Sequence, residues 1–200
     1  MKPRAILVAL GAFAVLLLPA TTHAHLVNTG LGPYYDGVSH FALTPEDLLP
    51  ALALALLAGQ RGSRAGRLVL FALPGAWLAG GLVGLALPSI GSATALTTLS
   101  ILALGGLVAG EAPLRAEWVS GLALALGLLH GYLNGSAMSQ AKLGALGLVG
   151  IVTTLFVLVA LAAALVVALR SSWARVAVRV AGSWIMAIGL LLLGWSLRGA

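Results

Sequence analysis

The sequence predicts an all-α integral membrane protein, with six transmembrane helices that follow an N-terminal signal peptide. Of its 200 residues, 60% are hydrophobic and only 8% are charged, whereas soluble domains carry about 25% charged residues. Long apolar runs alternate with short loops that hold the basic residues. The chain also begins with a short basic and apolar segment, which is typical of a secretory signal. The absence of cysteine excludes disulfides, thiolate metal sites and a cysteine nucleophile.

Residues 1–24 form the predicted signal peptide. A basic start at residues 2–4 precedes an apolar run at residues 5–18, which is shorter than the roughly 20 residues that cross a bilayer. Small residues flank His23, at the two positions that a signal peptidase reads. We expect cleavage after Ala24, so that the mature chain begins at His25 outside the cytoplasm. An uncleaved signal anchor is the alternative.

Six apolar runs in residues 25–200 predict a six-helix transmembrane domain. Backbone groups in lipid must be hydrogen-bonded within their own segment, so the runs are expected to be helices. The predicted spans are residues 37–58, 68–87, 93–109, 113–133, 143–169 and 180–197. Thr44-Pro45 interrupts the first span, and the fifth is long enough to require a tilt.

The basic residues between these runs predict their orientation. The loops after the first, third and fifth spans hold Arg61, Arg64, Arg67, Arg115, Arg170, Arg175 and Arg179. The opposite side holds only Lys142 and Arg198. Because cytoplasmic loops carry the excess of basic residues, we expect a multi-pass protein of the bacterial inner membrane with its mature N-terminus outside the cytoplasm. The net charge of +6 therefore reflects orientation in a lipid bilayer and not nucleic-acid binding.

Polar residues concentrate at the outer end of the first span. Ionisable residues inside membrane segments are costly, so a functional role is the first hypothesis. Asp36, His40 and Asp47 would share one face of a continuous helix, since their spacings are four and seven residues. Residues 44–47, however, also resemble a helix start, with Thr as N-cap, Pro at the first position and acids in the first turn. Glu46 and Asp47 are therefore either capping acids, site residues or both.

A second polar group ends the fourth span. His130 and Asn134 are four residues apart on one predicted helix face, and Gly131 clears space beside the imidazole. A buried structural histidine and a site residue are both open interpretations of His130. After cleavage, His25 would offer a free amine and an imidazole that can chelate a metal. The alternative is that His25 is an incidental residue of the cleavage region.

These side chains form a mixed nitrogen and oxygen donor set. Imidazole with carboxylate and amide oxygens suits Ni²⁺, Co²⁺, Cu²⁺ or Zn²⁺, whereas Ca²⁺ and Mg²⁺ prefer oxygen alone. The candidate ligands are His25, Asp36, His40, Glu46, Asp47, His130 and Asn134. Since neutral histidine is the ligand, binding should weaken below about pH 6.5. The metal would be a substrate, and no tightly bound cofactor is expected.

Two motifs resemble those of the HupE/UreJ family of bacterial membrane proteins, and the resemblance runs from residue 1 to about residue 195. That family is regarded as nickel or cobalt permeases linked to hydrogenase and urease maturation. In its first motif, roughly H-P-x-x-G-x-D-H, His40 matches the first histidine, while Glu46 and Asp47 replace the aspartate and the second histidine. In its second, roughly F-H-G-x-x-H-G, His130 matches the first histidine and Asn134 replaces the second.

The resemblance implies a metal permease that captures its ion at the outer face. His40 with Asp47 or Glu46, and His130 with Asn134, would bind the ion. A metal-binding accessory protein that delivers metal to a membrane or maturation partner is the alternative, because the inner halves of the spans offer few polar groups. A membrane hydrolase finds little support, since the chain has no Gly-x-Ser-x-Gly element. We therefore expect a protein that is not an enzyme.

Overall fold

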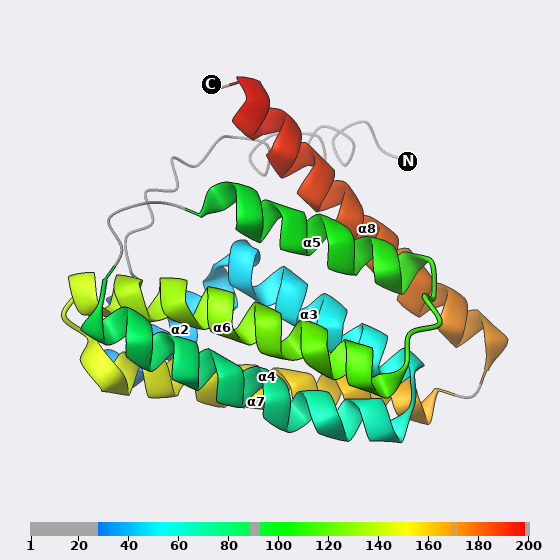
Figure 1. Cartoon of the computed structure of the whole chain (residues 1–200), viewed down its shortest axis with the longest axis horizontal. Coiled ribbons are helices and arrows are strands. Elements are labelled where there is room, and N and C mark those ends of the chain that lie inside the picture. Colours follow the sequence, from blue (N-terminus) through cyan, green and yellow to red (C-terminus); the bar gives the residue numbers. More distant parts are fainter. Residues whose placement is uncertain (1–27, 89–92, 170, 199–200) are drawn as a thin grey trace, which may run out of the picture.

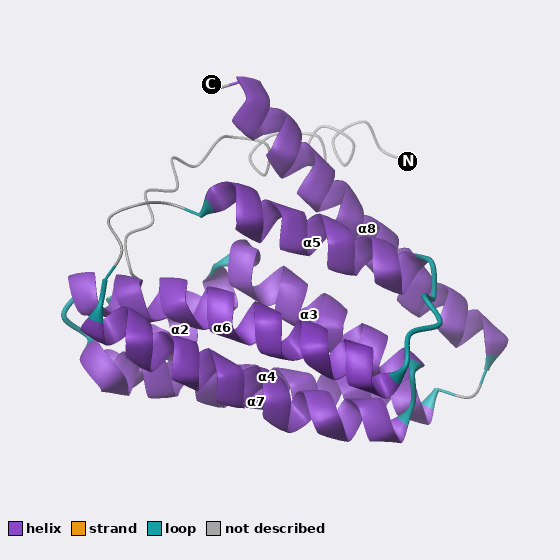
Figure 2. Ribbon diagram, in the orientation of Figure 1, coloured by secondary structure: helices purple, strands orange, loops and turns teal. Residues whose placement is uncertain are grey.

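The chain folds into a bundle of α-helices (Figures 1 and 2). The computed structural model describes residues 28–88, 93–169 and 171–198, and every regular element in these ranges is a helix. The helices are α2 (Pro33–Leu43), α3 (Pro45–Gln60), α4 (Ser63–Ala86), α5 (Thr94–Ala109), α6 (Ala116–Gln140), α7 (Gly144–Ala168) and α8 (Ser172–Arg198). The predicted all-α class is confirmed. The predicted signal peptide and His25 lie outside the described residues.

Three or four of these helices qualify as membrane spans by length and composition, fewer than the six predicted. Helices α4, α7 and α8 qualify alone, and α2 with α3 qualifies as one span bent by 72°. Helix α5 is apolar but has only 16 residues. Helix α6 has 25 residues, and its second half carries His130 and Asn134, which lower its hydropathy. These results support a multi-pass membrane protein and leave the count of six as a proposal.

Several helices extend beyond the predicted apolar runs. Helix α4 begins at Ser63 and α8 at Ser172, so both include arginines that the sequence analysis placed in loops. Helix α6 continues to Gln140. Arginine is a good helix former, and its long side chain can reach the aqueous boundary from a helical backbone. The apolar runs therefore predict the membrane-buried part of each helix and not its ends.

Helix α3 is the central helix of the bundle. It packs against α4, α5, α6, α7 and α8, while α4 pairs with α6, α5 with α8 and α2 with α7 (Figure 1). Seven consecutive residues of α3, from Ala53 to Gly59, are buried, as expected for a helix that is apolar on every side. An acid at the start of this helix, such as Asp47, is thereby placed in the interior.

Glycines allow α4 and α6 to pack with their backbones in close contact. A methyl group at Gly131 of α6 would overlap the carbonyl oxygen of Trp77 in α4, and one at Gly135 would overlap that of Gly81. Small residues spaced by four on one helix face are typical of close helix pairs in membranes. This contact places the face of α6 that carries His130 directly beside Trp77.

Arginines gather at one end of the bundle. Arg61 donates from Nη1 to the carbonyl oxygen of Ala112 at 2.8 Å, and Arg179 donates from Nε to that of Ala109 at 3.0 Å. Arg64 pairs with Glu117 at 2.8 Å, as expected for a solvated ion pair. We call this the arginine-rich end; its members are Arg61, Arg64, Arg67, Arg115, Arg175 and Arg179. Its existence agrees with the predicted grouping of the loops after the first, third and fifth spans.

Candidate metal site

The break between α2 and α3 brings His40 and Asp47 together. Thr44 adopts an extended conformation (φ −100°, ψ 98°), and Pro45 then begins α3. Thr44 is the N-cap residue by position, but its side chain makes no capping hydrogen bond. The 72° bend places the last turn of α2 beside the first turn of α3. As a result, His40 Nε2 lies 4.0 Å from Asp47 Oδ2.

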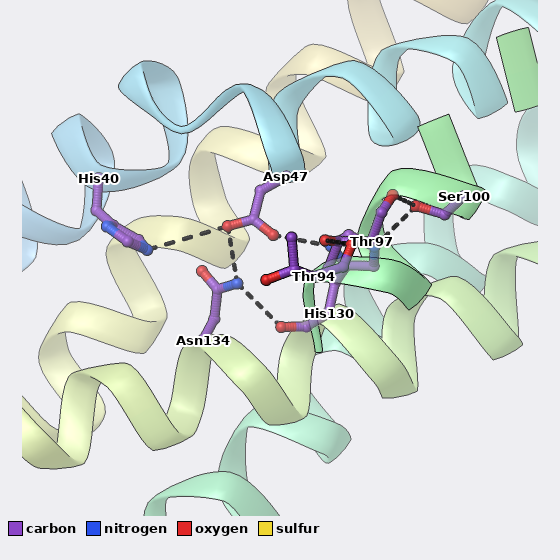
Figure 3. Close-up of polar contacts among 7 residues, drawn as sticks. All are labelled: His40, Asp47, Thr94, Thr97, Ser100, His130 and Asn134. Carbon is purple, nitrogen blue, oxygen red and sulfur yellow. Dashed lines mark hydrogen bonds and ion pairs between the residues drawn. The ribbon is translucent and has the colours of Figure 1, made fainter. Parts of the chain in front are cut away.

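Asp47 is the centre of a buried polar cluster (Figure 3). Its side chain is almost fully buried, and its Oδ1 lies 2.8 Å from Nδ1 of His130. Asn134 donates from Nδ2 to Asp47 Oδ2 at 2.9 Å and also lies within hydrogen-bond distance of the His130 carbonyl oxygen. A carboxylate in an apolar interior requires such partners. Helices α2, α3 and α6 thus meet at one carboxylate, and both motif histidines contact it.

Both ring nitrogens of His130 are engaged. Nε2 lies 3.1 Å from Ser100 Oγ, and that hydroxyl lies 2.7 Å from the carbonyl oxygen of Thr97. Nδ1 faces the Asp47 carboxylate at 2.8 Å. Which of Nε2 and Ser100 Oγ donates depends on the tautomer of the ring. Both ring nitrogens therefore have a protein partner in this arrangement.

Aromatic side chains enclose the His130 ring. Trp77 lies against it with ring centroids 5.4 Å apart, and Phe41 meets Trp77 edge-on at 5.8 Å. All three side chains are fully buried. This apolar cover excludes water from the imidazole and strengthens its hydrogen bonds to Asp47 and Ser100.

One buried acceptor at the site has no donor. Asn134 Oδ1 is buried and lacks a hydrogen-bond partner among the described residues. Figure 3 shows the amide oxygen of Asn134 on the side of the site where His40 lies. Unsatisfied buried acceptors are rare in folded proteins, and an ion or a water commonly accounts for them. His40, Asp47 and Asn134 thus present a nitrogen and two oxygens to a common region.

This donor set is smaller than that of a structural metal site. Within the described residues no group of three or more His, Cys, Asp or Glu side chains is arranged to hold a metal ion. The 4.0 Å between His40 Nε2 and Asp47 Oδ2 would nevertheless accept an ion bonded to both at about 2 Å each, on nearly opposite sides. The amide oxygen of Asn134 would be a third donor.

Asp47, His130 and Ser100 follow one another as the acid, base and hydroxyl of a serine hydrolase do. The Ser100 hydroxyl also lies 2.7 Å from the Thr97 carbonyl oxygen, a bond that hydroxyls in apolar helices commonly make. Asp47 and Ser100 together hold the imidazole in place. The predicted ligands did not include Ser100, since no local spacing links two residues 30 positions apart on different helices.

Two predicted ligands are not brought into this cluster, and a third lies outside the described residues. Asp36 accepts hydrogen bonds from the backbone N–H and the hydroxyl of Thr29, at 2.7 and 2.6 Å, and so ties the chain before α2 to that helix. Because α2 ends before Asp47, Asp36 does not share a continuous helix face with it. Glu46 is partly buried and makes no ion pair with another described residue. His25 lies outside the described residues.

Comparison with known proteins gives one match. Residues 13–192 match the family described as HupE / UreJ protein. The matched range includes both motifs and every described helix up to the last turns of α8. No curated protein and no solved structure matches the chain. The chain therefore belongs to the HupE / UreJ protein family, whose members are membrane proteins linked to metal handling.

Proposed function

We propose that this protein is a permease for a divalent transition-metal ion of the nickel or cobalt type. The observation that carries the proposal is the Asp47 carboxylate, which is buried inside an apolar helical bundle and contacted from two other helices. An ionisable group in such a place is retained at a cost and points to an ion pathway. The family match supports the same reading.

In this proposal Asp47, His40 and Asn134 contact the ion, and His130 supports Asp47. Oδ1 of Asn134, which lies beside His40 and makes no hydrogen bond of ordinary geometry, supplies an acceptor for a cation. His130 and Ser100 would orient the carboxylate from behind, as hydrogen-bonded outer-shell groups do at metal sites. Nitrogen and oxygen donors suit Ni²⁺ and Co²⁺, and also Cu²⁺ and Zn²⁺. A site with few protein ligands also suits an ion that must leave again.

We further propose that six segments cross the bacterial inner membrane, with α2 and α3 forming one broken span. The arginine-rich end would face the cytoplasm, by the positive-inside rule. Residues 1–24 would be removed, and the mature N-terminus would lie outside. The ion would then be captured near the outer face and released at the arginine-rich end. Broken helices at membrane depth commonly line such binding sites.

A metal-binding accessory protein is the second candidate, and the hydroxyl groups of α7 and α8 favour it. Thr153 donates to the carbonyl oxygen of Val149 and Thr154 to that of Gly150, at 2.7 and 2.9 Å. Ser183 donates to the carbonyl oxygen of Arg179 at 3.1 Å. Hydroxyls bound to their own helix do not form a polar path for an ion. Such a protein would hold the metal at the outer face and pass it to a partner.

Metal binding and metal flux, measured on the same preparation, test these proposals. The purified chain should bind about one equivalent of Ni²⁺ or Co²⁺, and His40→Ala should weaken that binding. Proteoliposomes that contain the wild-type chain should then accumulate the metal faster than empty vesicles. Binding without flux would favour the accessory protein. Absence of binding by Ni, Co, Cu and Zn alike would refute both.

A further inference from the structure

A groove on the lateral surface of the bundle lies between α4 and α7, near the arginine-rich end. It has a volume of about 440 Å³ and is lined by the first two turns of α4 and the last turns of α7. These two helices pack against each other (Figure 1). Both qualify as membrane spans, so the groove opens toward lipid. It is separate from the Asp47 site, none of whose residues lines it.

Small side chains keep the groove open. Gly66 and Ala163 are buried at its floor, while Ala164 and Ala168 line an exposed wall. A methyl group at Gly66 would lie 3.7 Å from the Ala163 side chain, in ordinary contact, so the floor is formed by packed helices. An apolar channel of this kind matches a hydrocarbon chain, which gains by burying its methylene groups against protein.

One unpaired cation stands at the groove. Arg67 is exposed and lines it, and Arg67 forms no ion pair with any described residue. Arg64, one turn earlier on the same helix, is paired with Glu117 at 2.8 Å. No acidic residue lines the groove. Arg67 therefore supplies the unpaired positive charge of the groove, and the described residues offer no anionic group to pair with it. An anionic ligand would provide that group.

We propose that this groove binds an anionic phospholipid, with an acyl chain between α4 and α7 and the headgroup phosphate on Arg67. Basic pockets between transmembrane helices are known positions for acidic headgroups. A second copy of this chain fits the charges less well. Copies in one membrane share their orientation, so a partner would bring its own arginine-rich end beside Arg67, and like charges would meet.

Lipid binding to the full chain in detergent tests this proposal. Native mass spectrometry would compare retention of phosphatidylglycerol and phosphatidylcholine by wild type, Arg67→Gln and Arg64→Gln. We expect wild type to retain phosphatidylglycerol over phosphatidylcholine. In Arg67→Gln the ratio of the two retained lipids should fall by about fivefold. The matched variant Arg64→Gln should keep it, because Arg64 is engaged by Glu117 and does not line the groove.

A groove-filling variant, Ala164→Phe, tests the acyl-chain part of the proposal. It should lower retention of both lipids while leaving the helical content unchanged. Equal retention of the two lipids by wild type, or no loss in Arg67→Gln, would overturn the proposal. The wild-type chain could instead form a dimer that is insensitive to phosphatidylglycerol and is disrupted by Ala164→Phe. That result would assign the groove to a second copy and would also overturn the lipid proposal.

Discussion

Asp47 Oδ1 lies 2.8 Å from Nδ1 of His130, and this contact joins α3 to α6 across 83 positions of sequence. Both side chains are buried. The two polar groups that the sequence places at the first and fourth predicted spans therefore form a single cluster. Asp47 is the centre of this cluster, since every other residue of the cluster contacts it or supports a residue that does.

The first prediction concerns the charge of this cluster. Asp47→Asn keeps the shape of the side chain but removes the negative charge that would balance a divalent cation. We expect metal affinity to fall by about a hundredfold or more, since even outer-shell partners of a metal are worth about 10–100-fold. Calorimetric titration of the purified variant with Ni²⁺ and Co²⁺ measures the change.

Glu46→Gln is the matched control for that experiment. Glu46 is the neighbouring acid, at the same helix start, and forms no ion pair in the described part of the chain. Its affinity should stay within about twofold of wild type, a change too small to reflect loss of a metal ligand. A large loss in Glu46→Gln with none in Asp47→Asn would reassign the ligand from Asp47 to Glu46.

A second prediction separates two roles for His130: support of the Asp47 carboxylate and direct binding of the metal ion. Ser100→Ala leaves Nε2 of His130 buried without its hydrogen-bond partner, which should cost about 1–3 kcal/mol of stability. Metal affinity should also fall, by about tenfold, because the support behind Asp47 is weakened. Thermal unfolding and metal titration of the same preparation give both values.

The direction of the affinity change decides between these roles. If Nε2 of His130 binds the metal directly, removing Ser100 would free that nitrogen, and the affinity would rise. Ser183→Ala is the control, because the Ser183 hydroxyl bonds only to its own helix, at Arg179. It should change neither the stability nor the affinity.

The sequence predicts the helices better than the site. Apolar runs and loop arginines define the helical class, the break at Thr44-Pro45 and the arginine-rich end, because these features depend on local composition. His40, Asp47, His130 and Asn134 were identified as polar residues that a membrane protein retains at a cost. Their convergence at one carboxylate depends on how α2, α3 and α6 pack.

Other features could not be read from local patterns. Asp36 has the spacing that places it on a face with His40, but Thr29 binds its carboxylate instead. Ser100 was not among the predicted ligands, and only the placement of α5 brings it to His130. Helix ends were also missed, since arginine and serine continue a helix beyond its apolar part.

A third prediction tests the close contact of α4 and α6. Gly131→Ala would place a methyl group against the Trp77 carbonyl oxygen, so the two backbones must separate. Overpacking of this kind costs about 1–3 kcal/mol, and we expect a lower unfolding temperature in detergent. Gly121→Ala on the same helix meets open space and should be neutral or stabilising by up to about 1 kcal/mol. Equal effects of the two substitutions would contradict a packing role for Gly131.

The last prediction concerns orientation in the membrane. The chain has no cysteine, so a single introduced cysteine can be labelled without background. Lys142 is exposed at the end of the bundle opposite to Arg115, which is exposed at the arginine-rich end. If the arginine-rich end is cytoplasmic, as the positive-inside rule requires, Lys142→Cys should react with a membrane-impermeant maleimide in spheroplasts. Arg115→Cys should react only after the membrane is opened. The reverse pattern would invert the proposed topology and would place the Asp47 site nearer the cytoplasm, so that the same residues would serve export or delivery from inside and not capture from outside.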